Sequence, residues 1–165
     1  MFNFFKKRNF DGDSSVLTSP VNGTCIDLSD VPDKVFSERM IGEGVAFIPD
    51  SDIFCSPCDG VVTMIARTAH AIGLQCGELE VLLHVGLDTV ELNGEGLKVL
   101  VKKDQKVRRG MPLIKINREL MNRKSVNLVS PLIILNHDKF DLKYENIGCM
   151  VRSSESTIIH IRKLD

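Results

Sequence analysis

The chain has 165 residues, 21 of them Lys or Arg and 22 Asp or Glu, so it is long enough for one domain and carries a net charge of −1. The balanced charge and the 5% of aromatic residues argue against a nucleic-acid-binding protein, and no apolar run approaches the roughly 20 residues of a membrane-spanning helix. The five cysteines, an odd number, are more typical of reduced thiols in a cytoplasm than of a disulfide framework.

The start of the chain differs in composition from the rest. Residues 1–15 are predicted to form a flexible tail, and residues 16–165 to form one domain. Phenylalanines and the cluster Lys6-Lys7-Arg8 occur together in residues 1–10. Weak peripheral contact of this segment with an anionic membrane surface is therefore the alternative interpretation. A secretory signal is not expected, because the charges follow the aromatic residues and no apolar core segment accompanies them.

β-Strand patterns dominate from Val16 onward. Short apolar or alternating runs recur about every ten residues between Pro, Gly, Asn and Asp, as in an antiparallel sandwich or barrel. Four such runs are Val61–Ala66, Leu79–Leu83, Leu113–Ile116 and Ile158–Ile161. The sequence therefore predicts an all-β fold.

Helix is predicted to be a minor component. Residues 34–39 are expected to form a turn or two of helix after Pro32, since proline suits the start of a helix. Residues 118–124 are a second short candidate. Asn93-Gly94 predicts a tight turn, because both residues tolerate positive φ.

One short motif occurs twice. Residues 19–24 are Ser-Pro-Val-Asn-Gly-Thr, residues 56–61 are Ser-Pro-Cys-Asp-Gly-Val, and Ser130-Pro131 repeats the opening. Each copy indicates a proline that enters an Asn-Gly or Asp-Gly turn and then a strand. The repetition favours a duplicated β architecture.

Two of the four histidines lie in apolar, strand-like surroundings. His70 follows Thr68-Ala69, and His84 ends the run Val81-Leu82-Leu83. A polar group among aliphatic residues must be hydrogen-bonded or it costs free energy. Strand alternation would place Thr68 beside His70, and Gly86 and Asp88 on the face of His84. Gly86 would leave room beside His84 for a bulky group or a partner protein.

The residues alone leave three interpretations of this pair open. The histidines could simply be hydrogen-bonded at strand ends. They could bind zinc, although two histidines without a His-x-His or His-Glu-x-x-His motif lack the third protein ligand of a catalytic site. They could also transfer a phosphoryl group, which needs one nucleophile, one stabilising donor and an open face.

The chain resembles the glucose-type enzyme IIA component of the bacterial phosphoenolpyruvate-dependent sugar phosphotransferase system. The similarity runs from about Ser19 to Arg162 and is most specific in the block from His84 to Gly96. The two Ser-Pro motifs, the segment from Asp30 to Phe36, Thr68-Ala69-His70-Ala71 and Val107-Arg108-Arg109-Gly110 also fit the family. The resemblance implies an antiparallel β-sandwich with Greek-key and jelly-roll features, a duplicated motif and no cofactor or catalytic metal.

The resemblance also implies roles for individual residues. His84 would accept a phosphoryl group on Nε2 from the phosphocarrier HPr, with its Nδ1–H held by a nearby backbone carbonyl such as that of Gly86. His70 would stabilise the phosphoryl oxygens and would be oriented by Thr68. The group would then pass to a cysteine of an enzyme IIB domain, in the cytoplasm, on its way to the incoming sugar.

A partner-binding surface is expected around the two histidines. Asp33 and Asp88 match acidic positions that in the family face basic residues of HPr. Val45, Ile72 and Leu82 are expected to be the apolar positions around the site. The alternative to an enzyme is a regulatory binding module of the same fold, in which phosphorylation adds charge to an interface.

The remaining reactive residues have simpler interpretations. Cys55 and Cys58 are expected to pack as small apolar side chains, because a single Cys-x-x-Cys is weak evidence for a zinc or redox site. His137 and His160 are expected on exposed turns or strand faces. The pairs Lys102-Lys103 and Arg108-Arg109 are expected at solvated hairpin edges.

Overall fold

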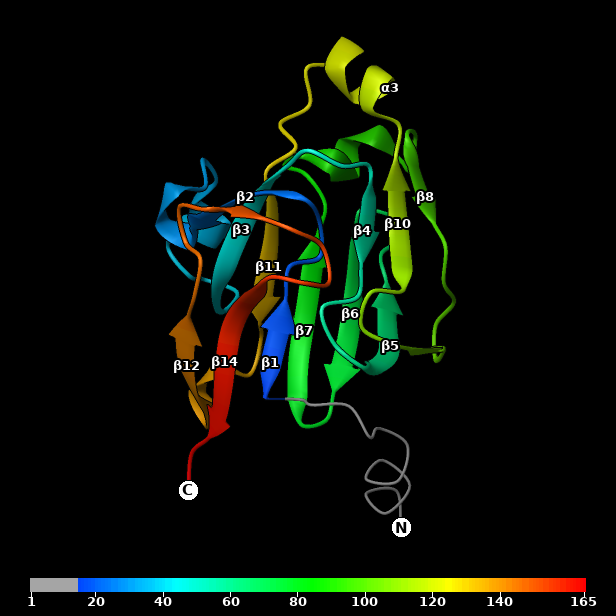
Figure 1. The fold of residues 1–165 in the computed structure, drawn as a ribbon. Helices are drawn as coiled ribbons and strands as arrows, with labels where there is room; N and C mark the ends of the chain where they lie inside the picture. Colours follow the sequence, from blue (N-terminus) through cyan, green and yellow to red (C-terminus); the bar gives the residue numbers. More distant parts are fainter. Residues whose placement is uncertain (1–14) are drawn as a thin grey trace.

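The computed structural model describes residues 15–165 of the chain (Figure 1). The tail predicted for residues 1–15 lies outside the described residues except for Ser15, and so does the membrane contact suggested for residues 1–10. The first strand begins at Val16.

Strands are the main regular secondary structure from Ser15 to Asp165. They are β1 (Val16–Thr18), β2 (Gly23–Asp27), β3 (Glu43–Pro49), β4 (Ile53–Cys55), β5 (Gly60–Ile65), β6 (Ala71–Cys76), β7 (Leu79–His84), β8 (Leu97–Val99), β9 (Lys106–Val107), β10 (Pro112–Ile116), β11 (Ser130–Ile134), β12 (Phe140–Tyr144), β13 (Met150–Val151) and β14 (Thr157–Lys163). The short helical segments are η1 (Leu28–Asp30), α2 (Lys34–Ser37), η2 (Thr89–Leu92), α3 (Arg118–Arg123) and η3 (His137–Lys139).

The strands form antiparallel sheets packed as a sandwich, which confirms the predicted fold class. The largest sheet has the order β13-β2-β3-β11-β7-β6-β5-β9, and two three-stranded sheets have the orders β1-β14-β12 and β4-β10-β8. Strand β11 lies between β3 and β7, which are far earlier in the chain. Such a return of a late strand between earlier ones is typical of Greek-key topology.

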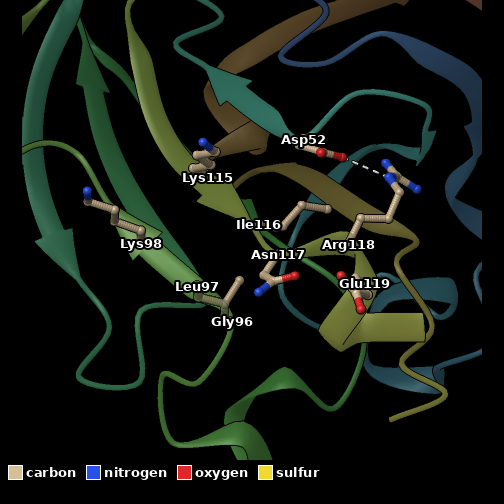
Figure 2. Close-up of a pocket in the computed structure, with 9 residues that line it drawn as sticks. All are labelled: Asp52, Gly96, Leu97, Lys98, Lys115, Ile116, Asn117, Arg118 and Glu119. Atoms are coloured by element: carbon tan, nitrogen blue, oxygen red, sulfur yellow. Dashed lines mark hydrogen bonds and ion pairs between the residues drawn. The ribbon is translucent and has the colours of Figure 1, made fainter. Parts of the chain in front are cut away.

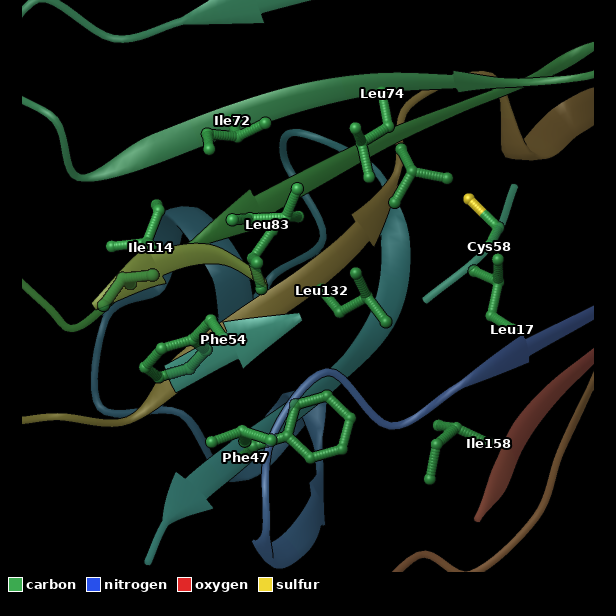
Figure 3. Packing of buried hydrophobic residues seen from close by; sticks show 14 of the residues in the cluster. Leu17, Phe47, Phe54, Cys58, Ile72, Leu74, Leu83, Ile114, Leu132 and Ile158 are labelled. Carbon is green, nitrogen blue, oxygen red and sulfur yellow. The ribbon is translucent and has the colours of Figure 1, made fainter. Parts of the chain in front are cut away.

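The core lies between these sheets and is almost entirely aliphatic (Figure 3). Leu83 of β7 and Leu132 of β11 face Phe54 of β4 and Ile114 of β10 across it, and all four are fully buried. Burying one such side chain contributes about 1.5–3 kcal/mol. The core therefore fixes β7, the strand that ends at His84, between its neighbours.

The repeated Ser-Pro motif forms two equivalent turns, as predicted. The Ser19 hydroxyl donates to the carbonyl of Val21, and the Ser56 hydroxyl donates to the carbonyl of Cys58, each at 2.6 Å. Both serines are fully buried, and both turns lead into a strand at a glycine, Gly23 for β2 and Gly60 for β5.

The two turns also bind each other through a reciprocal set of hydrogen bonds. The Thr18 amide donates to the carbonyl of Pro57 (3.1 Å), and the Cys55 amide donates to that of Pro20 (2.7 Å). The side chains of Asn22 and Asp59 then accept from the amides of Ser153 and Arg109, each at 2.8 Å. The duplicated motifs are therefore connected directly to each other by backbone hydrogen bonds.

The two predicted helices form, with different limits. α2 ends at Ser37, shorter than expected, and its cap is the Asp33 side chain, which accepts from the Val35 amide at 3.0 Å. Pro32 therefore precedes the cap instead of starting the helix. α3 begins at Arg118 as predicted and is capped by Asn117.

The expectation of five reduced cysteines is wrong in the structure. Cys58 and Cys76 form a disulfide, and Cys25, Cys55 and Cys149 are free thiols. The β5–β6 hairpin brings the end of β6 next to the second Ser-Pro turn, where the Cα atoms of Cys58 and Cys76 are 6.3 Å apart, within the range that a disulfide spans. Such proximity depends on strand pairing, so the cysteine spacing gave no sign of it.

Arg109 also differs from its predicted position at a solvated edge. Its guanidinium group donates to the carbonyls of Pro57 (2.8 Å) and Val16 (3.0 Å) and to the hydroxyl of Thr18 (3.2 Å). The side chain therefore ties β1 to the second Ser-Pro turn. Lys102, Lys103 and Arg108 are exposed, as expected.

Candidate functional site

His84 and His70 come together at one end of the β6–β7 pair. His84 is the last residue of β7 and pairs with Ala71, the first residue of β6. His70 immediately precedes β6, and its carbonyl accepts the Val85 amide at 2.7 Å. The two imidazole centroids are 5.0 Å apart with an interplanar angle of 72°. Antiparallel pairing thus brings together two histidines that are fourteen residues apart in the chain.

The tautomer of His84 follows from its hydrogen bond. Nδ1 lies 2.8 Å from the carbonyl oxygen of Gly86. A carbonyl can only accept, so Nδ1 carries the proton and the neutral ring has its free lone pair on Nε2. The backbone therefore leaves one specific nitrogen of His84 free to act as a nucleophile.

Gly86 is required by the backbone and by packing. Its φ is +71°, and a Cβ atom there would lie 2.6 Å from Cγ2 of Thr89 and 3.2 Å from the carbonyl oxygen of Asn127. The predicted reason, room for a partner beside His84, is therefore wrong, because the missing side chain would point into packed structure. The Gly86 amide donates to the hydroxyl of Ser130 at 3.0 Å, which holds the turn against β11.

His70 is oriented by Thr68, although the two residues do not share a strand face. The Thr68 hydroxyl lies 2.6 Å from Nδ1 of His70. Both residues belong to the turn between β5 and β6, where Ala69 has a φ of +62°. Strand alternation therefore does not explain the contact, but the turn brings Thr68 and His70 together as predicted. When the hydroxyl donates to Nδ1, the proton of a neutral His70 is on Nε2.

Phe36 forms a wall of the site that sequence reasoning did not identify. The buried ring of Phe36 meets His84 edge-on, with centroids 5.0 Å apart. The sequence spacing could have indicated this position, because Phe36 lies one turn after Asp33, a residue already expected near the site. Its position on a short helix that packs against the sheet could be recognised only in the fold.

Both site histidines have a pKa below the usual value. Burial is the main cause for His84, and the neighbouring His70 lowers its pKa further, whereas the Gly86 hydrogen bond and the carboxylates of Asp33 and Asp88 oppose the shift. Burial also lowers the pKa of His70, opposed by a hydrogen bond to the Thr68 backbone. Both imidazoles are therefore neutral near pH 7.

Asp33 and Asp88 lie close enough to His84 to affect its pKa. Asp33 caps α2, and Asp88, with a φ of +57°, precedes η2 without capping it through its side chain. The two carboxylates give the surroundings of the histidines a negative charge.

Two of the three apolar residues expected around the site are inside the core. Val45 and Ile72 are fully buried, so their predicted place on a partner surface is wrong. Strand alternation turns both toward the opposite sheets. Leu82 is partly exposed and shares the outer face of β7 with His84. It packs against the cluster of Leu28, Val31, Phe36, Ala46, Leu87 and Ile133.

A β-sandwich that holds a free imidazole nitrogen beside a second neutral imidazole has side chains suited to nucleophilic or proton-transfer chemistry. Residues 15–140 match the family described as phosphoenolpyruvate-dependent sugar phosphotransferase system, EIIA 1. The chain belongs to this family and has a phosphocarrier role in the sugar phosphotransferase system.

Similarity to solved structures agrees with this assignment. The chain is 35% identical to glucose permease IIA from Mycoplasma capricolum, with a TM-score of 0.81 over 91% of this chain and 96% of that one. Helicobacter pylori Csd3 matches with 15% identity and a TM-score of 0.47 over 91% of this chain and 35% of that one, which is too distant to support any argument.

Proposed function

We propose that His84 accepts the phosphoryl group on Nε2, and that His70 stabilises the group during transfer. The observation that carries this proposal is the hydrogen bond from Nδ1–H of His84 to the Gly86 carbonyl, which leaves Nε2 as the free nitrogen. A nucleophile must keep its lone pair, and the lowered pKa of His84 favours the unprotonated ring.

In the proposed step the Nε2 lone pair attacks phosphorus as the bond from phosphorus to the donor breaks. Nδ1 keeps its proton, and the Gly86 carbonyl stabilises the positive charge that develops on the ring. His70, with its proton on Nε2, donates a hydrogen bond to an equatorial phosphoryl oxygen, where charge must be stabilised in the transition state. Phe36 excludes water from one side of His84, which slows hydrolysis of the phosphorylated ring.

The proposed donor is phospho-HPr, and the proposed acceptor is a cysteine of an enzyme IIB domain in the cytoplasm. Asp33 and Asp88 give the site a negative rim, which would attract a basic donor protein and speed its association. Leu82 contributes a partly exposed apolar contact beside His84. The proposed transfer uses no nucleotide or metal, since the phosphoryl group passes directly between side chains.

The proposal is tested by incubating the chain with labelled phosphoenolpyruvate, enzyme I and HPr. We expect acid-labile label on the protein, because a phosphoramidate hydrolyses in acid. His84→Gln should abolish the label, and His137→Gln, a matched change in a histidine outside the site, should leave it intact. His70→Gln should keep the acceptor but slow transfer by roughly 100- to 1,000-fold, the cost of removing one preorganised donor. Normal labelling of His84→Gln would refute the assignment.

A further inference from the structure

Positive charge is concentrated in the segment of the chain that contains β8, β9 and β10. Residues 98–115 contain seven Lys or Arg residues and one acidic residue, Asp104. Because the whole chain has 21 basic and 22 acidic residues, the remaining residues hold 14 basic and 21 acidic. The net charge of −1 therefore conceals a strong separation of charge. The five exposed lysines of this segment are named here the basic edge: Lys98, Lys102, Lys103, Lys106 and Lys115.

The basic edge carries charge that the protein does not neutralise. None of its five lysines forms an ion pair with any residue from Ser15 to Asp165. Several cations elsewhere are paired, as in Arg39–Glu43, Lys124–Glu95, Arg162–Asp141 and Lys163–Glu78. The unpaired charge of the basic edge is therefore available to an external anion.

Two of the lysines lie side by side on neighbouring strands. Lys98 of β8 pairs directly with Lys115 of β10, and like charges in that position are mutually destabilising. Both line a hollow of about 600 Å³. Figure 2 shows their ammonium groups on one side of the hollow, with the Asp52–Arg118 ion pair on the other. An anionic group above the two lysines would relieve their repulsion.

Exposed apolar side chains accompany the charge. Leu100 is 40% exposed, Met111 37% and Ile53, directly opposite Lys115, 39%. Residues 98–115 include no aromatic residue, so the segment lacks the stacking platforms of single-stranded nucleic-acid binding. Lysines mixed with aliphatic side chains match the interface of an anionic bilayer, where charge attraction and shallow apolar insertion act together.

We propose that the basic edge docks the protein on an anionic phospholipid surface. In the large sheet, β9 is separated from β7 by β5 and β6, and Figure 1 shows β8 and β10 at the side of the molecule opposite β12 and β14. The strand that ends at His84 is therefore not adjacent to β9 in the sheet. This surface would hold the phosphocarrier near a membrane and is separate from the proposed phosphoryl transfer.

The test is co-sedimentation of the full chain with vesicles of phosphatidylglycerol and phosphatidylcholine in equal parts, and with phosphatidylcholine alone. We expect binding only to the anionic vesicles, and release by salt, which screens exposed charges. The variant Lys102→Gln/Lys103→Gln/Lys106→Gln should partition on the order of 100-fold more weakly, since each lysine near an anionic surface contributes about a factor of five. The control Lys139→Gln/Lys143→Gln/Arg152→Gln makes the same change in net charge elsewhere and should bind as the unmodified chain does.

Three results would overturn the proposal. Unchanged binding by the basic-edge variant would assign membrane contact to another part of the chain. Equal binding to both vesicle types would show that charge is not involved. Tighter binding to a DNA fragment than to the anionic vesicles would assign the surface to nucleic acid. Phosphoryl acceptance by the basic-edge variant is expected to be normal, so loss of docking and loss of transfer are distinguishable.

Discussion

At the scale of single residues, two hydrogen bonds give two similar imidazoles different properties. His84 donates from Nδ1 to a carbonyl, whereas Nδ1 of His70 contacts a hydroxyl that can donate to it. With the hydroxyl as donor, a neutral His70 has its proton on Nε2, where His84 has a free lone pair. This difference suits a nucleophile and a stabilising donor, the two roles proposed for them.

The lowered pKa values predict how stability depends on pH. Burial holds the pKa of both His84 and His70 below 6.5 in the folded state, so the unfolded chain binds more protons below that pH. The free energy of unfolding should therefore fall as the pH drops through about 6.5, and this contribution should be constant at higher pH. Urea denaturation at several pH values measures it.

The comparison for this pH dependence is the variant His70→Gln/His84→Gln. Its free energy of unfolding should fall less between pH 7.5 and 5.5, because the two side chains that gain protons on unfolding are absent. An equal fall in the variant would contradict the expectation. His137→Gln is the matched control for the loss of a histidine outside the site.

At the scale of elements, the turn after β7 determines the orientation of His84, the proposed phosphoryl acceptor. Three contacts hold this turn: the Gly86 amide to Ser130, the Leu87 amide to the Asn127 carbonyl (2.8 Å), and the Thr89 hydroxyl to the Val85 carbonyl (2.6 Å). Two of them come from the segment just before β11 or from β11 itself. The Gly86 carbonyl is therefore positioned by a strand more than forty residues away.

Gly86→Ala should damage both the stability of the protein and its site. An alanine at positive φ costs about 1–2 kcal/mol, and its Cβ would lie 2.6 Å from Thr89. The turn must shift, so we expect phosphoryl acceptance to slow by roughly 10- to 100-fold, as for a small misplacement of a reacting group. Thermal denaturation and labelling rates measure the two effects.

Gly148→Ala separates backbone strain from displacement of the site. Gly148 has a φ of +83°, and a Cβ atom added there would have no neighbour within 4 Å. This variant should lose a similar free energy of unfolding through strain alone and should accept the phosphoryl group at the normal rate. A normal labelling rate for Gly86→Ala would show that the Gly86 carbonyl does not orient His84.

At the scale of the whole molecule, the duplicated Ser-Pro turns and the Cys58–Cys76 disulfide join distant parts of the chain. The two turns exchange backbone hydrogen bonds, and the second turn also contains Cys58. The disulfide then joins this second turn to the end of β6.

Thiol titration tests the disulfide. In the folded protein, the exposed Cys149 and the half-exposed Cys55 should react, whereas Cys25 should not, because burial raises its pKa to about 12. The unfolded chain should show three thiols without reductant and five after reduction. Reduction should lower the free energy of unfolding by about 3 kcal/mol, as expected for a closed loop of this size. Five thiols in the unfolded chain without reductant would contradict the pairing.

The sequence by itself determined the features that depend on local pattern. Alternating runs indicated the strands, Asn93-Gly94 the turn, the two Ser-Pro motifs the duplication, and the block around His84 the family. Interactions between neighbouring residues are enough to predict these features, because strand periodicity and turn chemistry are local properties.

Only the tertiary structure decided features that depend on pairing between distant segments. It placed Phe36 against His84, joined Cys58 to Cys76, and placed Val45 and Ile72 in the core. A one-residue difference in register reverses the face of every side chain in a strand, so residues near the site in sequence can point away from it. The sequence therefore singled out His70 and His84 as candidate site residues. Their surroundings depend on which strands lie side by side in the fold.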